Sequence, residues 1–171
     1  MHRAKALLEA AKEFLTRVYH ESHDLGLNLD PFEWDHICLR VENWDQYKEQ
    51  KEAFSQVGLL LSEALVGGRP IATYKLREPL SFLRHRIPCV EIPAPKAGSS
   101  YAFGWEHVEC VVEEDLEAFA ARHTELIFDK RALKKSLNPE LVWKLPSGLS
   151  VKFHRQSLEE VIKIENSHSA Q

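Results

Sequence analysis

The chain has 171 residues, of which 44% are hydrophobic and 28% are charged, and its formal net charge is −4 at pH 7. This length fits one compact domain, or two small halves that fold together, and it can bury a core without disulfides or a structural metal. The mild negative charge and the lack of a dense basic run argue against a nucleic-acid-binding protein. No window approaches the ~20 apolar residues of a membrane span, so a membrane partner is not expected either.

The cysteines indicate the cellular compartment. Cys38, Cys89 and Cys110 are odd in number, show no CxxC spacing, and each lies in an apolar, strand-like run. Such cysteines are typical of small buried side chains in a reducing environment. The N-terminal stretch contains acidic residues and lacks the apolar core of a signal peptide. We therefore expect a cytoplasmic protein.

The N-terminal half begins with an amphipathic pattern. Apolar residues at i, i+3, i+4 and i+7 predict a helix over residues 3–20, and the segment 21–33 is expected to be a loop. Gly58 predicts the end of a second helix, and the pair Gly67-Gly68 predicts a hairpin turn. The segments that follow the loop are expected to form, in order, a strand, a helix and three strands: 34–41, 44–57, 59–66, 70–76 and 80–93.

The C-terminal half repeats this order after a linker-like stretch rich in proline, glycine and serine. A closing helix over 157–165 is predicted by Ser157 and Glu160, which have the spacing of a capping box. We expect one compact domain with an N-terminal helical segment (1–30), a first module (31–97) and a second module (98–171). The second module is expected to contain a strand, a helix and three strands: 105–112, 113–123, 125–130, 140–145 and 148–155.

An internal repeat indicates that the two modules arose by duplication. The sequence Trp-Asp-His-Ile at 34–37 matches Trp-Glu-His-Val at 105–108, position by position, and the segment 72–76 resembles 141–145. Self-similarity at a long period is typical of a duplicated structural unit. We therefore predict an α+β fold of paired βαβββ modules that form a curved mixed sheet, or half-barrel, around a cleft, with the N-terminal helix outside.

Strand alternation selects candidate site residues. Since successive side chains point to opposite faces of a strand, His36 and His107 lie opposite the apolar faces that the helices cover. The last strands of the two modules present Glu91 and Lys152 in the same way. If the two sheets curl toward each other, His36, Glu91 and His107 converge. Other residues on these faces are Cys38, Arg40, Cys89, Glu109, Ser150 and His154.

Two imidazoles and a carboxylate suit a divalent metal such as Fe, Mn, Ni or Zn, which could polarise a bound oxygen or acidify a bound water. Other interpretations remain open. A single histidine is more often a hydrogen-bonded structural residue, and Glu91 could be paired with Lys152 or Arg40. Arg40 could be a member of a salt bridge, or it could hold a carboxylate or phosphate group of a ligand.

Seven collinear segments resemble the YecM-like proteins, a small bacterial family near the vicinal-oxygen-chelate (glyoxalase-like) superfamily. The resemblance spans most of the chain. It is carried by DHICLR (35–40), GRPI (68–71), KLREP (75–79), VEIPAP (90–95), GWEHVE (104–109), LNP (137–139) and VKFHRQSLEEVI (151–162).

The resemblance implies metal ligands on the first and last strands of each module, and His36, Glu91 and His107 match these positions. The fourth position is Lys152, and a protonated lysine cannot be a ligand. His154 could replace it if the strand end curls inward, and Glu109 is another candidate. Alternatively, Lys152 neutralises Glu91 or holds an anionic ligand, while a water completes the metal shell.

Two functions follow from these residues. The first is a metal-dependent isomerase, epimerase, lyase or oxygenase acting on a small oxygenated metabolite, with His36 and His107 as ligands and Glu91 as ligand or proton-transfer base. The second is a non-catalytic binding protein that holds a small anionic metabolite through Arg40 and Lys152. The intact His-Glu-His set favours the first function, and Lys152 favours the second. The substrate and the oligomeric state stay open.

Overall fold

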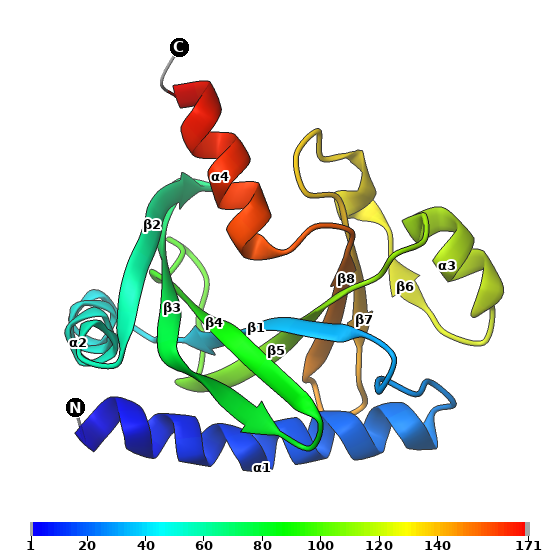
Figure 1. Ribbon diagram of the computed structural model, residues 1–171, viewed down its shortest axis with the longest axis horizontal. Coiled ribbons are helices and arrows are strands. Elements are labelled where there is room, and N and C mark those ends of the chain that lie inside the picture. Colours follow the sequence, from blue (N-terminus) through cyan, green and yellow to red (C-terminus); the bar gives the residue numbers. More distant parts are fainter. Residues whose placement is uncertain (1, 170–171) are drawn as a thin grey trace. The chain divides into compact units, whose positions relative to one another are not determined.

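The computed structural model describes residues 2–169, which contain four α-helices, one 3-10 helix and eight strands (Figure 1). The chain divides into two compact units. Unit 1 comprises residues 2–15 and His36–Glu106, and unit 2 comprises Thr16–Asp35 and residues 107–169. Residues 1, 170 and 171, at the ends of the predicted segments, lie outside the described part of the chain.

Unit 1 contains a four-stranded mixed sheet with the strand order β2-β3-β4-β1. Strands β1 and β4 pair in parallel, and the other pairs are antiparallel. Helix α2 contacts β2, β3 and β4 (Figure 1). The elements are the first part of α1 (His2–Asp24), β1 (Glu33–Arg40), α2 (Trp44–Ser55), β2 (Gly58–Val66), β3 (Arg69–Phe82), β4 (His85–Pro93) and the start of β5 (Gly104–Val111).

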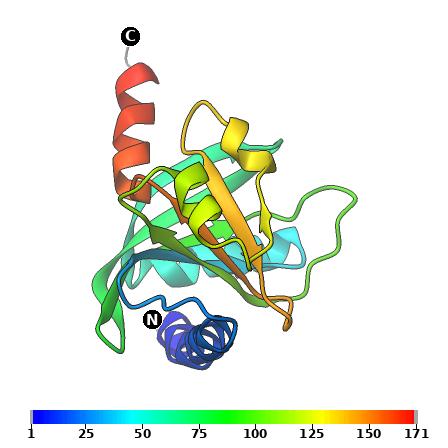
Figure 2. The same ribbon diagram turned by 90° about the vertical axis from the view of Figure 1, so that its right-hand side faces the viewer.

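Unit 2 repeats this plan with the strand order β5-β8-β7-β6. Strands β5 and β8 are parallel, and the other pairs are antiparallel. Helix α3 lies beside the last strands (Figure 2), where the rings of Phe119 and Phe153 are 4.9 Å apart. The further elements are α3 (Leu116–Arg122), β6 (Phe128–Asp129), a 3-10 helix (Arg131–Lys134), β7 (Glu140–Lys144), β8 (Ser150–His154) and α4 (Leu158–Ser169). Each unit therefore contains the predicted βαβββ order.

The first and last strands of the two modules pair in the same register. This agreement supports the duplication inferred from the sequence, since equivalent residues occupy equivalent places in both ladders. It also means that one module can be compared with the other residue by residue. The pairs are His36 with Cys89 and Cys38 with Glu91 in unit 1, and His107 with Ser150 and Glu109 with Lys152 in unit 2.

The two units differ in their aromatic cores. In unit 1, the ring of Phe54 lies 6.3 Å from Tyr74 and 6.5 Å from Trp105. In unit 2, four phenylalanines form one cluster, in which Phe119 and Phe153 each contact the other three rings. Ring contacts join Phe32, Phe119, Phe128 and Phe153.

Helix α1 is longer than the sequence pattern predicts, and part of the expected loop 21–33 is helical. The helix ends at Asp24, and Gly26 follows with φ +91°. The amide of Leu27 donates to the carbonyl of Ser22 at 2.9 Å, and that of Gly26 donates to His23 at 3.0 Å. These two bonds form a Schellman motif, in which a glycine adopts the left-handed conformation that ends the helix.

Other boundaries also differ from the prediction: the strand expected over 125–130 is limited to β6 (Phe128–Asp129), and two further shifts have a clear local cause. Residues 80–82 belong to β3, not to the following strand, and the chain turns at Leu83, which has φ +50°. Helix α3 begins later than expected because the Asp115 side chain accepts hydrogen bonds from the amides of Glu117 and Ala118. An aspartate in this position satisfies the first free amides of a helix and so determines where it starts.

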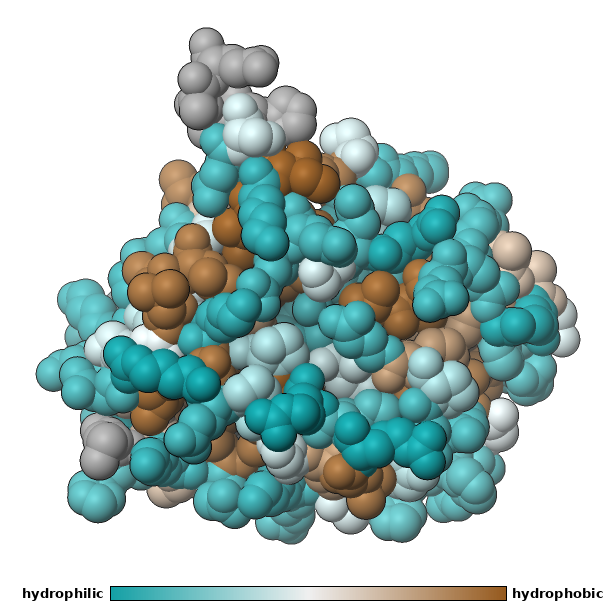
Figure 3. Space-filling model, in the orientation of Figure 1, coloured by the Kyte–Doolittle hydropathy of each residue, from teal (hydrophilic) through white to brown (hydrophobic). Residues whose placement is uncertain are grey.

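The edge strands of the two units contrast strongly. Strand β2 has nine residues and forms an edge of the unit 1 sheet, whereas β6 has two. Apolar side chains gather on the surface over β2 (Figure 3), where Leu59 is 65% exposed and Leu65 is 79% exposed. Short edge strands limit unwanted pairing with other chains, so the β2 edge of unit 1 is more prone than β6 to pair with a strand of another chain.

Across residues 2–169, no helix has an apolar stretch long enough to cross a lipid bilayer.

Candidate functional site

In unit 1, the predicted histidine and glutamate lie beside each other. His36 is in the middle of β1 with 1% of its side chain exposed, and Glu91 is on β4. The His36 Nε2 atom lies 3.9 Å from Glu91 Oε2. The strand register explains this proximity, because Cys38 pairs with Glu91 and alternation brings His36 to the same face. The face assignment made from the sequence therefore holds within unit 1.

In unit 2, the equivalent histidine has a carboxylate neighbour from its own strand. The Nε2 atom of His107 lies 3.1 Å from Oε1 of Glu109, and both side chains are buried. Residues two apart on a strand share a face, so the proximity follows from β5 alone. Lys152, on β8, donates to Glu109 Oε1 at 2.8 Å and lies 3.9 Å from Glu140 Oε1. The side chain at the fourth expected ligand position is thus a cation that pairs with a carboxylate.

His154 belongs to a different buried group. Its Nε2 atom lies 3.7 Å from Asp35 Oδ2 and 3.9 Å from Glu109 Oε2, and its Nδ1 atom lies 3.3 Å from the side-chain oxygen of Asn138. Asp35 also accepts a hydrogen bond from the amide of Leu158 at 2.9 Å. His154 and Asp35 therefore belong to one buried group that joins β8 to the start of α4.

Arg40 forms the salt bridge that the sequence left as one alternative. Its Nε atom donates to Glu106, and its guanidinium lies 4.8 Å from the ring centre of Tyr101. Arg69 lies over the same ring at 5.6 Å. Burial acts to lower the pKa of Arg40, but Cys38, Glu106 and Tyr101 raise that pKa by more. Arg40 is therefore a firmly charged member of a local cation-π and ion-pair group.

The acid within the repeated motif is a feature that sequence reasoning missed. Asp35 and Glu106 occupy equivalent positions directly before the two histidines. Asp35 is 1% exposed and binds the first turn of α4, whereas Glu106 binds Arg40. The repeat itself pointed to these two acids. An acidic side chain occurs in both copies of the motif, and within a largely apolar strand it needs a partner in the folded protein.

The three cysteines are fully buried and none forms a disulfide, as their placement in apolar strands predicts. Burial, together with Glu109 and Asp35, raises the pKa of the Cys110 thiol well above its ordinary value. A thiol in this environment stays protonated and is a poor nucleophile. Cys110 is therefore a packing residue.

The donor atoms in each unit have a spacing that suits a metal ion. Two ligand atoms that each lie about 2.1 Å from one tetrahedral metal are about 3.4 Å apart. The separation is 3.9 Å between His36 and Glu91 and 3.1 Å between His107 and Glu109. These values lie on either side of the tetrahedral spacing. Each unit can therefore supply one imidazole and one carboxylate to a divalent cation.

Comparison with known proteins finds one matching family model and related sequences in two organisms. A family model described as "YecM protein" matches residues 3–147. Protein YecM of Escherichia coli (strain K12) is 34% identical over 160 residues, and the match covers 85% of each chain. An uncharacterized protein of Haemophilus influenzae is 30% identical over 99 residues, which are 58% of this chain and 52% of that one.

Solved structures show the same fold. One described as "Structural Genomics, Protein EC4020" has a TM-score of 0.79 at 31% identity and covers 94% of this chain and 92% of its own. Methylmalonyl-CoA epimerase in complex with methylmalonyl-CoA and NH4+ has a TM-score of 0.52 at 14% identity, with coverage of 74% and 96%. The glyoxalase-like fold expected from the sequence is therefore confirmed.

Proposed function

The chain belongs to the YecM family and has a glyoxalase-like fold, and from this premise we propose that it binds a divalent metal ion of the Fe, Mn, Ni or Zn group. The proposed ligands are His36 and Glu91 of unit 1 and His107 and Glu109 of unit 2. The observation that carries the proposal is the repeated pair of a buried histidine Nε2 and a carboxylate oxygen, 3.9 Å apart in unit 1 and 3.1 Å apart in unit 2.

The path of the chain supports the joint use of both pairs. Unit 1 and unit 2 are connected within β1 between Asp35 and His36, and within β5 between Glu106 and His107. The two histidines are thus the first residues after two of the points where the chain passes from one unit to the other. A metal ion held by both pairs would fix these two crossings together.

Glu109 is a better fourth ligand than His154. Glu109 already lies beside His107, whereas His154 contacts Asp35 and Asn138 in the group that holds the start of α4. Lys152 would then control the charge of the site through its 2.8 Å hydrogen bond to Glu109. A cation at this distance weakens the attraction between the carboxylate and a metal, so the site is expected to bind metal with moderate affinity.

The proposed reaction is isomerisation, epimerisation, elimination or oxygenation of a small oxygenated metabolite. A bound metal would supply a Lewis acid that stabilises negative charge developing on a substrate oxygen. Glu91, the more exposed of the two carboxylates, is the proposed proton-transfer base, and Lys152 and Arg40 are proposed to orient anionic groups of the substrate.

A second function is favoured by the Lys152–Glu109 pair. If this ion pair takes the place of a metal, the chain is a binding protein for a small anionic metabolite that does not catalyse a reaction. The two candidates differ in whether the histidines are ligands, so metal binding separates them directly.

The test is the metal content and metal affinity of untagged protein. We expect about one divalent metal per chain in the wild type, and a loss of at least about tenfold in affinity for His36→Ala or His107→Ala, because each removes a ligand. His23→Ala is the matched control, since the His23 side chain is exposed and its ion-pair partner, Asp24, is exposed as well. Circular dichroism reports whether each variant is folded.

Wild-type protein that carries no transition metal and binds none at micromolar concentration would overturn the metal proposal. In that case, binding of a dicarboxylate that is lost in Lys152→Met would support the second function.

A further inference from the structure

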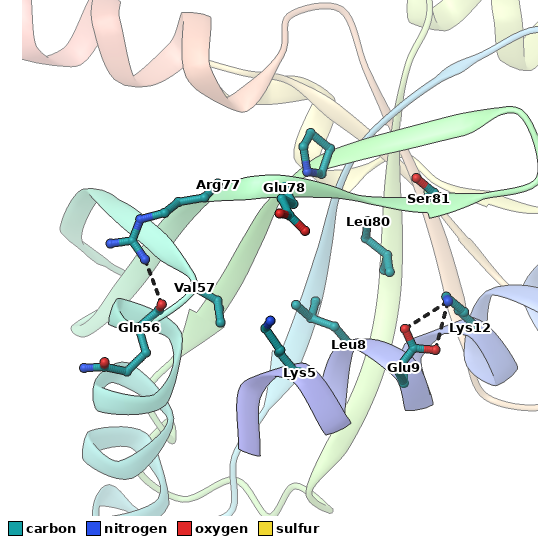
Figure 4. A pocket seen from close by; sticks show the side chains of 11 residues that line it. Lys5, Leu8, Glu9, Lys12, Gln56, Val57, Arg77, Glu78, Leu80 and Ser81 are labelled. Carbon is teal, nitrogen blue, oxygen red and sulfur yellow. Dashed lines mark hydrogen bonds and ion pairs between the residues drawn. The ribbon is translucent and has the colours of Figure 1, made fainter. Parts of the chain in front are cut away.

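A hollow lies entirely within unit 1, and its lining includes neither His36 nor Glu91. It has a volume of about 650 Å³ and lies between α1, the end of α2 and the middle of β3 (Figure 4). We call it the α1–β3 pocket. Pockets that hold small molecules typically measure about 300–1,000 Å³, so its size suits a ligand. Its lining residues are Lys5, Leu8, Glu9, Lys12, Gln56, Val57, Arg77, Glu78, Pro79, Leu80 and Ser81.

The pocket arises from an irregularity in the sheet. Between the pairs Lys75–Cys89 and Leu80–Ile87, four residues of β3 (76–79) face one residue of β4 (Pro88). The extra residues bulge away from the ladder. Arg77 fastens the bulge to the end of α2, because its amide donates to Val57 at 3.0 Å and its guanidinium donates to the Gln56 carbonyl at 2.7 Å. This wall of the pocket is therefore held in place.

One face of α1 forms the opposite wall. Residues 5, 8, 9 and 12 have the spacing of a single helical stripe, and all four line the pocket. The Trp105 indole donates to the Leu7 carbonyl at 3.1 Å and so holds this part of α1 within unit 1. Leu8, Val57 and Leu80 give the pocket an apolar floor between the two walls (Figure 4).

Three of the five charged side chains at the pocket are already engaged. Lys12 forms an ion pair with Glu9 at 2.8 Å, and the Arg77 guanidinium, which keeps its charge, is directed away from the pocket toward the Gln56 carbonyl (Figure 4). Within residues 2–169, Lys5 and Glu78 have no hydrogen-bond or ion-pair partner. Figure 4 shows the Lys5 ammonium group and the Glu78 carboxylate pointing from opposite walls toward the space between them. The pocket therefore offers one positive and one negative group above an apolar floor.

We propose that the α1–β3 pocket binds a short zwitterionic peptide with apolar side chains, with the peptide carboxylate on Lys5 and its ammonium group on Glu78. A fatty acid or another simple anion would leave the Glu78 carboxylate facing negative charge, and a polyamine would leave Lys5 facing positive charge. A single amino acid would fill only a small part of 650 Å³. A dipeptide or tripeptide satisfies both charges and covers Leu8, Val57 and Leu80.

The test is calorimetric titration at low salt with the dipeptide Leu-Leu. We expect binding that weakens at least about fivefold when the peptide is N-acetylated or C-terminally amidated, because each change removes one charge-assisted contact. Gly-Gly, which keeps both charges without apolar side chains, is expected to bind too weakly to measure. Failure of Leu-Leu to bind at millimolar concentration, or equal binding of the blocked peptides, would overturn the proposal.

Protein variants test the two charged groups directly. Lys5→Met and Glu78→Gln are each expected to weaken Leu-Leu binding at least about fivefold, whereas Lys48→Met and Glu117→Gln, at exposed positions outside the pocket, should not. The double variant Lys5→Glu with Glu78→Lys reverses the two charges, so the peptide can bind in the opposite orientation and affinity should recover. Affinity that stays as low as in the single variants contradicts the charge assignment.

The pocket proposal is independent of the metal proposal. His36→Ala removes a proposed metal ligand but leaves every lining residue of the pocket unchanged, so it should retain Leu-Leu binding. Loss of peptide binding in a folded His36→Ala protein would contradict a separate site.

Discussion

Unit 1 and unit 2 use the same ladder register but distribute their charges differently. In unit 1, Cys38 of the first strand pairs with Glu91 of the last, and in unit 2, Glu109 pairs with Lys152. The carboxylate near the histidine thus comes from the last strand in one copy and from the first strand in the other. Duplication therefore preserved the positions of the side chains in the ladder, whereas substitution changed which of those positions carry a charge.

The acids that precede the two histidines also have different partners in the two units. Asp35 is buried and binds the amide of Leu158, whereas Glu106 is about one-third exposed and pairs with Arg40. Equivalent positions in the repeat therefore stabilise different parts of the fold. One holds a terminal helix and the other fixes a cation.

The largest expected effect concerns the cores. Phe153→Ala should lower the free energy of unfolding by about 3–5 kcal/mol, because the ring is fully buried and a cavity remains. Ile92 occupies the equivalent ladder position in unit 1. Ile92→Ala should lower the free energy of unfolding by less, because fewer buried atoms are lost. Denaturant unfolding measures both. Phe103→Ala, at a partly exposed position, is the control, and a loss for Phe153→Ala no larger than that of the control would contradict the packing difference.

The next prediction concerns the charge that distinguishes the two sites. Lys152→Met removes the ammonium group beside Glu109 and should raise metal affinity about tenfold, or ~1.4 kcal/mol, because the carboxylate is no longer neutralised by a neighbouring cation. Competition with a chelating dye measures the change. Lys144→Met, on the exposed side of β7, should leave affinity unaltered. Weaker metal binding in Lys152→Met would indicate that Lys152 supports the site.

Helix caps should behave alike in both units. In unit 2, the amide of Ser157 donates to Glu160 at 2.9 Å and that of Glu160 to Ser157 at 3.4 Å, which is the predicted capping box. In unit 1, Asn43 accepts a hydrogen bond from Gln46 at 2.9 Å. Ser157→Ala and Asn43→Ala should each cost about 1 kcal/mol. If Asp35 alone is enough to cap α4, thermal melts would show a clearly smaller loss of stability for Ser157→Ala than for Asn43→Ala.

The smallest effect is a pH dependence located in unit 1. Hydrogen bonds from Lys51 and Tyr47, each 2.6 Å long, lower the pKa of Glu63. Because the folded pKa lies below the unfolded value of about 4.3, the stabilisation is complete above that value and is lost as pH falls through the folded pKa. Glu63→Gln should therefore lose stability at pH 7 and show a shallower decline in acid. Urea midpoints between pH 7 and pH 3 that run parallel to wild type would contradict this role.

The sequence predicted a large part of the architecture. The Trp-x-His repeat indicated duplication, and the two modules have equal registers. Strand alternation placed His36 with Glu91 and His107 with Glu109, and the helix start at Ser157 followed from its spacing to Glu160. These predictions were possible because they depend on local periodicity, which a few neighbouring residues determine.

Other features depended on contacts between distant segments. The loop expected over 21–33 is partly helix because Gly26 ends α1 only after Asp24, and the bulge in β3 that forms the α1–β3 pocket reflects an unequal pairing with β4. Neither feature follows from the hydrophobic pattern that was used to predict the elements.

What the sequence determined by itself was the repeated unit, the faces of its strands and the two histidines with their neighbouring carboxylates. The tertiary structure decided which charges became partners. Asp35 meets Leu158 across 123 positions of the chain, and Lys152 meets Glu109 across 43. Residues this far apart are brought together only when the strands pair and the helices pack, so periodicity can assign a face to a side chain but cannot choose its partner.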